Sequence, residues 1–285
     1  MKQIAVLLTC HNRKDKTIAC LTSLYNCVVP ENFSINVFLV DDGSTDGTKE
    51  AVSIKYPLTN IIQGDGSLFW AGGMQLAWKT AKDDKSFDGY LLLNDDVILV
   101  KSALMELAVT NEYCVNKYGK AGIYVGSTID SKSKMISYGG RLVTKKLFSY
   151  SMKIVEPKPI PQVCTLANAN ILLVMSSVVE EIGIFDNKFT HGIADYDYTL
   201  TAFENGIPLI VCPNVNGICE DDHGRNWVTG KSNLQQRIKY LFSPKGLAYR
   251  ENMYYLRKHF PAQLPYYFLM FWLKTFFPII WTKFK

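Results

Sequence analysis

The first hundred residues alternate short apolar runs with segments of helical periodicity. Branched apolar residues fill Ile4–Leu8 and Ile35–Val40, and shorter runs follow at Asn60–Gln63 and Gly89–Leu93. Between the last two runs, apolar side chains recur every three or four residues over Met74–Ala81, which is the spacing of one helix face. Strands separated by helices in this way predict a mostly parallel sheet with helices on both faces.

Two further helices are expected in this first half. One carries an apolar stripe of Ile18, Leu21, Tyr25 and Val28, and the other covers Thr45–Lys55.

Beyond about residue 100 the pattern is mixed. It predicts a helix over Ala103–Tyr118 and a strand over Gly122–Gly126, followed by hairpin-like polar sequence through Gly140. The proline-rich stretch Pro157–Pro161 excludes a central strand or a helix interior, so an extended connection is expected there.

Composition excludes several classes of protein. The 285 residues are 48% hydrophobic and show no internal repeat, which argues against a disordered chain and a repeat architecture. Seven cysteines without a C-x-x-C pair predict reduced thiols in the cytosol rather than a disulfide framework. The N-terminus lacks a long apolar signal core, so the catalytic body is expected to stay in the cytosol.

Charge is distributed unevenly along the chain. From Lys231 onward there are ten Lys or Arg residues and one acid, whereas the first 230 residues hold 21 basic and 25 acidic ones. Within this basic tail, Gln263–Thr282 is rich in aromatic residues and holds one charge, Lys274. This pattern favours a helix that lies on an anionic membrane. A core or dimer-contact helix is the alternative, and no nucleic-acid partner is expected.

Polar clusters follow each of the four predicted strands. They are Thr9–Arg13, Asp41–Thr48, Gly64–Ser67 and Asn94–Asp96. Because the carboxyl ends of the strands form the binding crevice of an open α/β sheet, we expect one site built from all four.

These residue types suit a nucleoside diphosphate bridged by a metal ion. Backbone amides at helix starts and Arg13 suit a diphosphate, while Asp41 or Asp42 can accept hydrogen bonds from a base or a ribose. Asp95 and Asp96 would repel the diphosphate unless a divalent cation lay between them. An ordinary capped turn is the alternative for the segment that begins at Asp41.

In the order and spacing of three motifs, the chain resembles the family 2 glycosyltransferases. The motifs are Thr9-x-x-Asn12-Arg13, Val40-Asp41-Asp42-Gly43-Ser44-Thr45-Asp46-Gly47-Thr48 and Leu93-Asn94-Asp95-Asp96. The resemblance implies an α/β fold of the GT-A type: a single Rossmann-like, mostly parallel sheet flanked by helices, with a smaller mixed acceptor-side part. It suggests a glycosyltransferase domain over 1–230, with a nucleotide-binding half (1–100) and an acceptor half (101–230), followed by a membrane-associating helical tail (231–285).

The resemblance also implies roles on the donor side. The donor-nucleotide residues would be Thr9, Asn12, Arg13, Asp41, Asp42, Asp65 and Asp95. Of these, Asp42 would hold the base and Asp95 would reach the ribose or the sugar. Asp96 would bind a divalent cation, Mn²⁺ or Mg²⁺, on the diphosphate. The family's metal motif begins with an acid at the position of Asn94.

A second metal ligand is expected in the cluster Glu220–Trp227. Imidazole binds manganese-like ions, and by resemblance His223 would bind beside the diphosphate. Arg225 could neutralise the leaving diphosphate. A solvated acidic loop is the alternative for this cluster.

The acceptor side is expected around Phe189–Tyr198. By resemblance Asp195 is the general base, which takes the proton of an acceptor hydroxyl as that oxygen attacks the anomeric carbon and inverts its configuration. Many relatives have a Glu where this chain has Ala194. Asp197 is either a second acceptor-binding acid or a helix-surface charge, and Trp70 is either a stacking platform for a sugar or a core side chain.

The resemblance, together with the basic aromatic tail, implies a metal-dependent, inverting glycosyltransferase on the inner face of the cell membrane. By the same resemblance its donor would be a UDP- or dTDP-linked sugar and its acceptor a lipid-linked intermediate or a polysaccharide, as in bacterial O-antigen, capsule or exopolysaccharide synthesis. An NAD-type oxidoreductase is disfavoured because the turn after the first strand, Thr9–Arg13, has no glycine. A sugar nucleotidyltransferase and a non-catalytic, membrane-associated sugar-binding protein are the alternatives.

Overall fold

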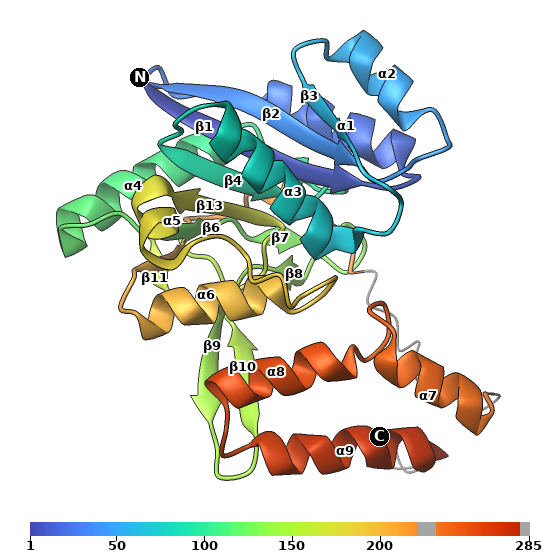
Figure 1. Cartoon of the computed structure of the whole chain (residues 1–285). Coiled ribbons are helices and arrows are strands. Elements are labelled where there is room, and N and C mark those ends of the chain that lie inside the picture. Colours follow the sequence, from blue (N-terminus) through green and yellow to red (C-terminus); the bar gives the residue numbers. More distant parts are fainter. Residues whose placement is uncertain (222–231, 280–285) are drawn as a thin grey trace.

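An eight-stranded sheet is the centre of the computed structural model, which describes residues 1–221 and 232–279 (Figure 1). In sheet order its strands are β11 (Gln162–Val163), β14 (Leu209–Val211), β6 (Ile123–Val125), β13 (Ile171–Met175), β4 (Gly89–Leu93), β1 (Lys2–Cys10), β2 (Phe33–Asp41) and β3 (Asn60–Gln63). Strands β4, β1, β2 and β3 are parallel. Strand β13 runs antiparallel to β4 and β6, and β11 runs antiparallel to β14. The prediction of a mostly parallel sheet is confirmed.

Parallel pairing brings the loops after β1 and β2 together. Thr9 lies opposite Val40 and Cys10 opposite Asp41. Both strands are buried over their last five residues, because helices cover both faces of the sheet. The polar residues that follow the two strands therefore lie side by side at the same edge of the sheet.

Helices flank both faces of the sheet, except that α7, α8 and α9 pack on one another beyond α6 (Figure 1). In chain order the helices are α1 (Lys14–Tyr25), α2 (Thr48–Lys55), α3 (Phe69–Asp84), α4 (Ala103–Tyr118), α5 (Ser176–Ile182), α6 (Ala194–Glu204), α7 (Leu234–Phe242), α8 (Tyr249–His259) and α9 (Leu264–Phe276). One core joins α3, α6 and α8 through Trp78, Tyr198 and Tyr255. The opposite core includes Leu21 of α1 and Leu107 of α4.

The helix α1 differs from its expected stripe. Leu21 is buried as predicted, but Tyr25 and Val28 are exposed, and Leu24 is buried in their place. The helix ends at Tyr25, whose ring stacks on Tyr56 with centroids 4.9 Å apart at the surface. Val28 therefore lies past the end of the helix, and Tyr25, its last residue, lies at the surface.

The helix α2 begins three residues later than expected. Gly47 takes a left-handed conformation, with φ of 80°, and precedes the first helical residue, Thr48. Asp46 accepts hydrogen bonds from the Thr48 backbone N–H (3.1 Å) and hydroxyl. The segment 45–47 is therefore a turn rather than the first turn of the helix.

Two small sheets complete the second half of the chain. One contains β5 (Ile98–Leu99), β15 (Gly217–Ile218), β7 (Thr128–Ile129) and β8 (Ile136–Tyr138). The other contains β10 (Tyr150–Ile154), β9 (Gly140–Lys145) and β12 (Leu166–Ala167). The β9–β10 hairpin extends away from the large sheet to the end of the molecule that carries α8 and α9 (Figure 1). The stretch Pro157–Pro161 forms the connection between β10 and β11, as predicted.

The C-terminal helices are continuous with the packing of the body. Tyr255, Leu256 and Phe260 are buried in the same core as α3 and α6, and the Phe260 ring stacks on Tyr150 of the hairpin at 4.1 Å between centroids. In the described ranges, no helix has the length and apolar character needed to cross a bilayer. The domain division at residue 230 stays a prediction.

Candidate functional site

A cleft of about 410 Å³ opens at the carboxyl ends of β1, β2 and β4. Its lining comes from all four predicted loops and from two later segments of the chain. The lining residues are Thr9, Cys10, His11, Arg13, Asp42, Gly66, Phe69, Trp70, Asp95, His191 and Lys245. The structure therefore brings together five of the residues singled out from the sequence: Thr9, Arg13, Asp42, Trp70 and Asp95.

Asp42 closes the loop between β3 and α3. One of its carboxylate oxygens accepts the backbone N–H of Gly66 (2.8 Å), and the other accepts those of Leu68 (3.0 Å) and Phe69 (3.2 Å). The carboxylate thus takes up N–H groups at the start of α3, where the helix dipole favours negative charge. A Cβ on Gly64 would lie 2.6 Å from the Asp42 carboxylate and 2.9 Å from its Cα, so this close approach requires glycine.

Asn12 and Asp41 are not part of the cleft lining. The amide oxygen of Asn12 accepts the backbone N–H of Thr45 (2.8 Å), and the Asn12 backbone N–H donates to the Ser44 hydroxyl (2.9 Å). Asp41 is buried and accepts the backbone N–H of Ser44 (2.9 Å). Both residues therefore fix the loop after β2 against the loop after β1.

Thr9 lies in the cleft lining, whereas Asp65 lies outside it. Thr9 lines the cleft directly against α3, where a Cβ on Gly73 would lie 2.1 Å from the Thr9 hydroxyl oxygen. Asp65 is exposed outside the lining, and it accepts hydrogen bonds from the backbone N–H and hydroxyl of Ser67. Those bonds hold the pKa of Asp65 below its usual value.

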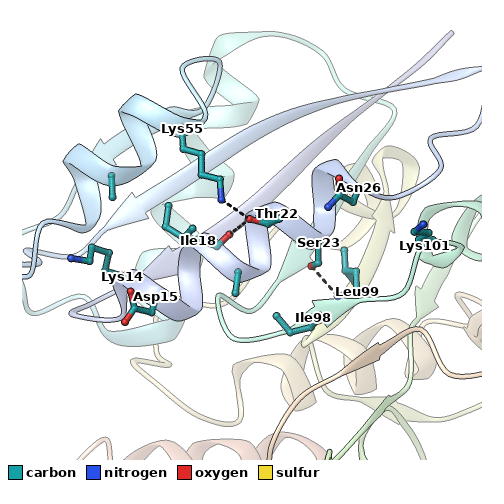
Figure 2. A pocket seen from close by; sticks show the side chains of 12 residues that line it. Lys14, Asp15, Ile18, Thr22, Ser23, Asn26, Lys55, Ile98, Leu99 and Lys101 are labelled. Atoms are coloured by element: carbon teal, nitrogen blue, oxygen red, sulfur yellow. Dashed lines mark hydrogen bonds between the residues drawn. The ribbon is translucent and has the colours of Figure 1, made fainter.

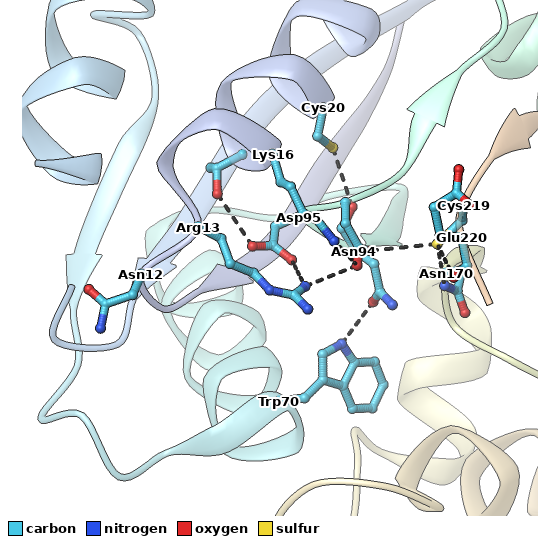
Figure 3. A network of polar contacts seen from close by, with 12 residues as sticks. Asn12, Arg13, Lys16, Cys20, Trp70, Asn94, Asp95, Asn170, Cys219 and Glu220 are labelled. Atoms are coloured by element: carbon cyan, nitrogen blue, oxygen red, sulfur yellow. Dashed lines mark hydrogen bonds and ion pairs between the residues drawn. The ribbon is translucent and has the colours of Figure 1, made fainter. Parts of the chain in front are cut away.

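Arg13 holds the two carboxylates that follow β4 (Figure 3). Its Nη1 lies 3.0 Å from Asp95 Oδ1 and 3.0 Å from Asp96 Oδ2. The hydroxyl of Thr17 donates to the other oxygen of Asp95 at 3.3 Å. Burial raises the pKa of Asp95 to about 6, although Arg13 acts in the opposite direction. Asp95 and Asp96 thus both contact the same nitrogen of the Arg13 guanidinium at the edge of the cleft.

Asn94 takes part in a neutral contact with Trp70. The indole N–H of Trp70 donates to the Asn94 amide oxygen at 2.8 Å, so an uncharged acceptor at this position suits the indole (Figure 3). The Asn94 backbone N–H donates to the carbonyl of Asn170 at 3.1 Å. Trp70 lines the cleft and also packs on Phe185, with ring centroids 5.6 Å apart. Trp70 therefore lies between the cleft and the core, and its role as a stacking platform for a sugar stays a prediction.

Cys219, which directly follows β15, joins this network, and no sequence motif points to it. Its thiol lies 3.6 Å from an Asp96 carboxylate oxygen and accepts from the Asn170 amide at 3.5 Å (Figure 3). Burial and the nearby Asp96 raise the pKa of the thiol far above its usual value. All seven cysteines are buried and free, consistent with the prediction of reduced thiols.

Asp195 lies in the first turn of α6. One of its carboxylate oxygens accepts the backbone N–H of Ala169 (3.1 Å), and the other accepts that of Tyr196 (2.8 Å). Burial raises the pKa of Asp195 to about 6, and the two backbone bonds only partly offset this effect. Asp195 does not line the cleft itself; His191, four residues earlier, does.

Asp197 is neither a surface charge nor a cleft residue, so this placement supports neither sequence-based alternative. It is buried, with one oxygen 2.8 Å from Lys258 Nζ and the other 2.9 Å from His259 Nε2. The second ring nitrogen of His259 lies 2.7 Å from Glu204. The buried carboxylate is satisfied by these partners, and it connects α6 to α8.

His223 and Arg225 lie outside the described residues. Within the parts of the chain that are described, no three His, Cys, Asp or Glu side chains gather in a way that could hold a metal ion. Asp96 remains a carboxylate donor at the cleft edge, and oxygen donors of this kind suit Mg²⁺ and Mn²⁺.

A larger hollow, of about 700 Å³, runs along the outer face of α1 (Figure 2). Its floor includes Ile18 and Leu99, and its rim includes Lys14, Lys55 and Lys101. It shares no lining residue with the cleft. None of the sequence motifs points into it.

Residues 5–109 match the family model described as Glycosyl transferase family 2. This segment contains all four loops that follow the parallel strands of the cleft. No curated protein sequence gives a significant match.

Solved structures share the fold over nearly the whole chain. One is the mannosyltransferase PcManGT from Pyrobaculum calidifontis in complex with GDP-Man and Mn²⁺, with a TM-score of 0.54 at 14% identity, covering 96% of this chain and 70% of that one. Another is TarS 1–349 from S. aureus in complex with UDP-GlcNAc, with a TM-score of 0.55 at 17% identity, covering 92% of this chain and 73% of that one. Residues 5–109 therefore match the family 2 glycosyl transferase model, and the described part of the chain has the GT-A type fold of these solved structures.

Proposed function

We propose that the protein is an inverting glycosyltransferase that moves a sugar from a nucleoside-diphosphate sugar to an acceptor hydroxyl. The observation that carries this proposal is the convergence of Thr9, Arg13, Asp42 and Asp95 in one cleft at the carboxyl ends of three parallel strands. Ligands bind at this edge in open α/β sheets. PcManGT and TarS were solved with GDP-Man and UDP-GlcNAc, which supports a nucleotide sugar here, and a UDP- or dTDP-linked donor remains our expectation.

Asp195 serves as the general base in this proposal. Its carboxylate takes the proton of the acceptor hydroxyl while that oxygen forms a bond to the anomeric carbon from the side opposite the diphosphate. The bond between the anomeric carbon and the β-phosphate oxygen breaks, and its electron pair leaves with the nucleoside diphosphate. A pKa of about 6 suits a base that works near neutral pH. A single displacement of this kind inverts the anomeric configuration.

A divalent cation, Mn²⁺ or Mg²⁺, belongs to the proposal. Asp95 and Asp96 direct carboxylate oxygens to one point, now taken by Arg13 Nη1, which is an arrangement that accepts positive charge. Asp96 would hold the cation together with His223. When bound, the ion would neutralise charge on the diphosphate leaving group. PcManGT was solved with Mn²⁺.

The acceptor is proposed to be a lipid-linked intermediate or a polysaccharide at the inner face of the cell membrane. Large apolar side chains are exposed on α9 and at the tip of the β9–β10 hairpin, among them Phe268, Leu269, Leu147 and Phe148. The Gln263 amide donates to the carbonyl of Lys146 at 2.7 Å, which holds the hairpin tip beside the start of α9. The tail carries ten basic residues and one acid, a balance that favours an anionic surface. Synthesis of bacterial surface polysaccharide is the setting we propose.

Ligand-dependent thermal stability tests the donor site. The purified protein would be heated with UDP, dTDP, GDP or CDP, each with and without Mn²⁺. A ligand that binds only the native state raises the melting temperature by mass action. We expect one diphosphate, together with Mn²⁺, to raise it. If none of the four has an effect, the protein is not a nucleotide-sugar enzyme, and the non-catalytic alternative gains.

A further inference from the structure

Lys245 is the cleft residue that comes from the C-terminal part of the chain. It lies in the turn that joins α7 to α8, and it lines the same cleft as Thr9 and Arg13. Its Nζ lies 5.6 Å from the centroid of the Phe69 ring. None of the sequence motifs includes it.

The turn that carries Lys245 is held firmly. The backbone N–H groups of Gly246 and Ala248 both donate to the Ser243 carbonyl, at 2.9 and 3.1 Å, and the N–H of Leu247 donates to the Tyr240 carbonyl at 3.0 Å. A Cβ on Gly246 would lie 2.0 Å from that Tyr240 oxygen. The backbone that follows Lys245 is therefore packed on the end of α7, and these contacts fix the position of the Lys245 main chain at the cleft.

Phe69 is placed under Lys245 by an uncommon backbone conformation. Its φ of 54° is left-handed, a region that is costly for an aromatic residue. The Asp42 carboxylate accepts the Phe69 N–H at 3.2 Å and so helps to maintain this conformation. The Phe69 ring also lies 6.0 Å from the His191 ring, between centroids. Strained residues of this kind gather at ligand sites.

Among the described residues, the charged side chains Arg13, Asp42 and Asp95 of the cleft lining are all held by close polar partners. Arg13 is shared between Asp95 and Asp96, and Asp42 accepts three backbone N–H groups. Within the described parts of the chain, the contact found for Lys245 is the face of Phe69. A bound anion would therefore find uncompensated positive charge at Lys245 rather than at Arg13.

We propose that Lys245 binds the diphosphate of the nucleotide-sugar donor. This inference rests on the proposed function. Lysine binds phosphate as a mobile point charge, and the flexible side chain of Lys245 is exposed at the cleft. When the bond to the anomeric carbon breaks, the electron pair moves onto the β-phosphate oxygen, and the ammonium group stabilises the added charge there.

Titration calorimetry on the full chain tests this role. The probes are the nucleoside diphosphate that stabilises the wild-type protein and the matching monophosphate, both with Mn²⁺. In Lys245→Met we expect the diphosphate to bind about tenfold more weakly and the monophosphate to change by less than threefold, because a charge-assisted contact is lost. Lys245→Arg should recover most of the diphosphate affinity.

The matched control is Lys239→Met on α7, an exposed lysine of the same basic segment that does not line the cleft. It should bind both probes as the wild type does, and melting temperatures of all variants check that they fold. Equal diphosphate affinity in Lys245→Met and the wild type would overturn the inference while leaving the proposed function standing. If the wild type binds no nucleoside diphosphate, both fail together.

Discussion

Asp195 and Asp197 lie two residues apart at the start of α6, yet their carboxylates meet different surroundings. Asp195 accepts the backbone N–H groups of Ala169 and Tyr196, and burial raises its pKa to about 6. Asp197 contacts Lys258 and His259 of the neighbouring helix. From sequence alone both were candidates for the acceptor site, because the spacing of two acids on a helix does not say which partner each one meets.

Replacing the proposed base should separate chemistry from binding. In Asp195→Asn we expect kcat to fall by about 10²–10⁴, the range of general base catalysis, while the donor Kd stays within twofold. Single-turnover transfer assays and donor titrations measure the two quantities. The control is Asp186→Asn, because Asp186 accepts from Tyr254 at 2.7 Å outside the cleft lining. Transfer by Asp195→Asn at the wild-type rate would exclude Asp195 as the base.

The raised pKa of Asp195 predicts a pH profile. The base works only when ionised, so kcat/KM should rise tenfold per pH unit below about pH 6 and level off above it. The folded pKa lies above the unfolded value, so ionisation disfavours the folded state and stability is lost as pH rises from about 4 to 6. At pH 8 the free energy of unfolding of Asp195→Asn should therefore exceed that of the wild type by on the order of 1 kcal/mol. A kcat/KM profile that is flat between pH 5 and 7 would contradict the assignment.

At the scale of elements, periodicity located most helices and strands of the first half. The strand over Gly89–Leu93 and the helix over Ala103–Tyr118 have the predicted bounds, since both combine a strong apolar pattern with clear ends. The errors at α1 and α2 fall at helix ends, where turn hydrogen bonds and surface ring stacking decide the boundary. The antiparallel position of β13 between β4 and β6 depends on long-range pairing, which apolar periodicity does not encode.

The contact between α6 and α8 gives a stability prediction. Asp197→Ala should lower the free energy of unfolding by about 3 kcal/mol, because it leaves Lys258 and the buried His259 without their shared carboxylate. Urea denaturation measures this change. Glu181→Ala, at an exposed position on α5, should change it by less than about 0.5 kcal/mol. Similar values for the two variants would show that the buried cluster contributes little.

At the scale of the whole molecule, the cleft combines segments that are far apart in the chain. The alternation of strands and helices in the sequence predicts that the loops after the strands meet, because parallel topology places them at one edge of the sheet. His191 and Lys245 reach the same cleft from a loop before α6 and a turn before α8. The Glu251 carboxylate of α8 accepts the Thr190 N–H at 3.2 Å, which connects these two segments. Tertiary contacts of this kind have no local pattern in the sequence.

The proposed membrane association involves the tip of the β9–β10 hairpin and α9 together. We expect Phe268→Ser with Leu269→Ser, and separately Leu147→Ser with Phe148→Ser, each to weaken binding to anionic phospholipid vesicles at least tenfold, since exposed apolar side chains would lose their burial in lipid. Vesicle co-sedimentation measures this binding. Ile54→Ser on α2 is the control, because Ile54 is 83% exposed at the other end of the molecule (Figure 1). Unchanged binding in both double variants would favour a protein partner on this surface.

A cleft lined by both Thr9 and Lys245 has a consequence for biosynthesis. While the chain is growing on a ribosome, the parallel strands and their loops emerge long before the turn between α7 and α8. The early segments can pair into a sheet, but the wall that carries Lys245 is still missing. If Lys245 binds the diphosphate as proposed, tight binding of a donor requires α7 and α8 to have folded against the cleft, and a nascent chain that lacks them would bind nucleotide sugar weakly.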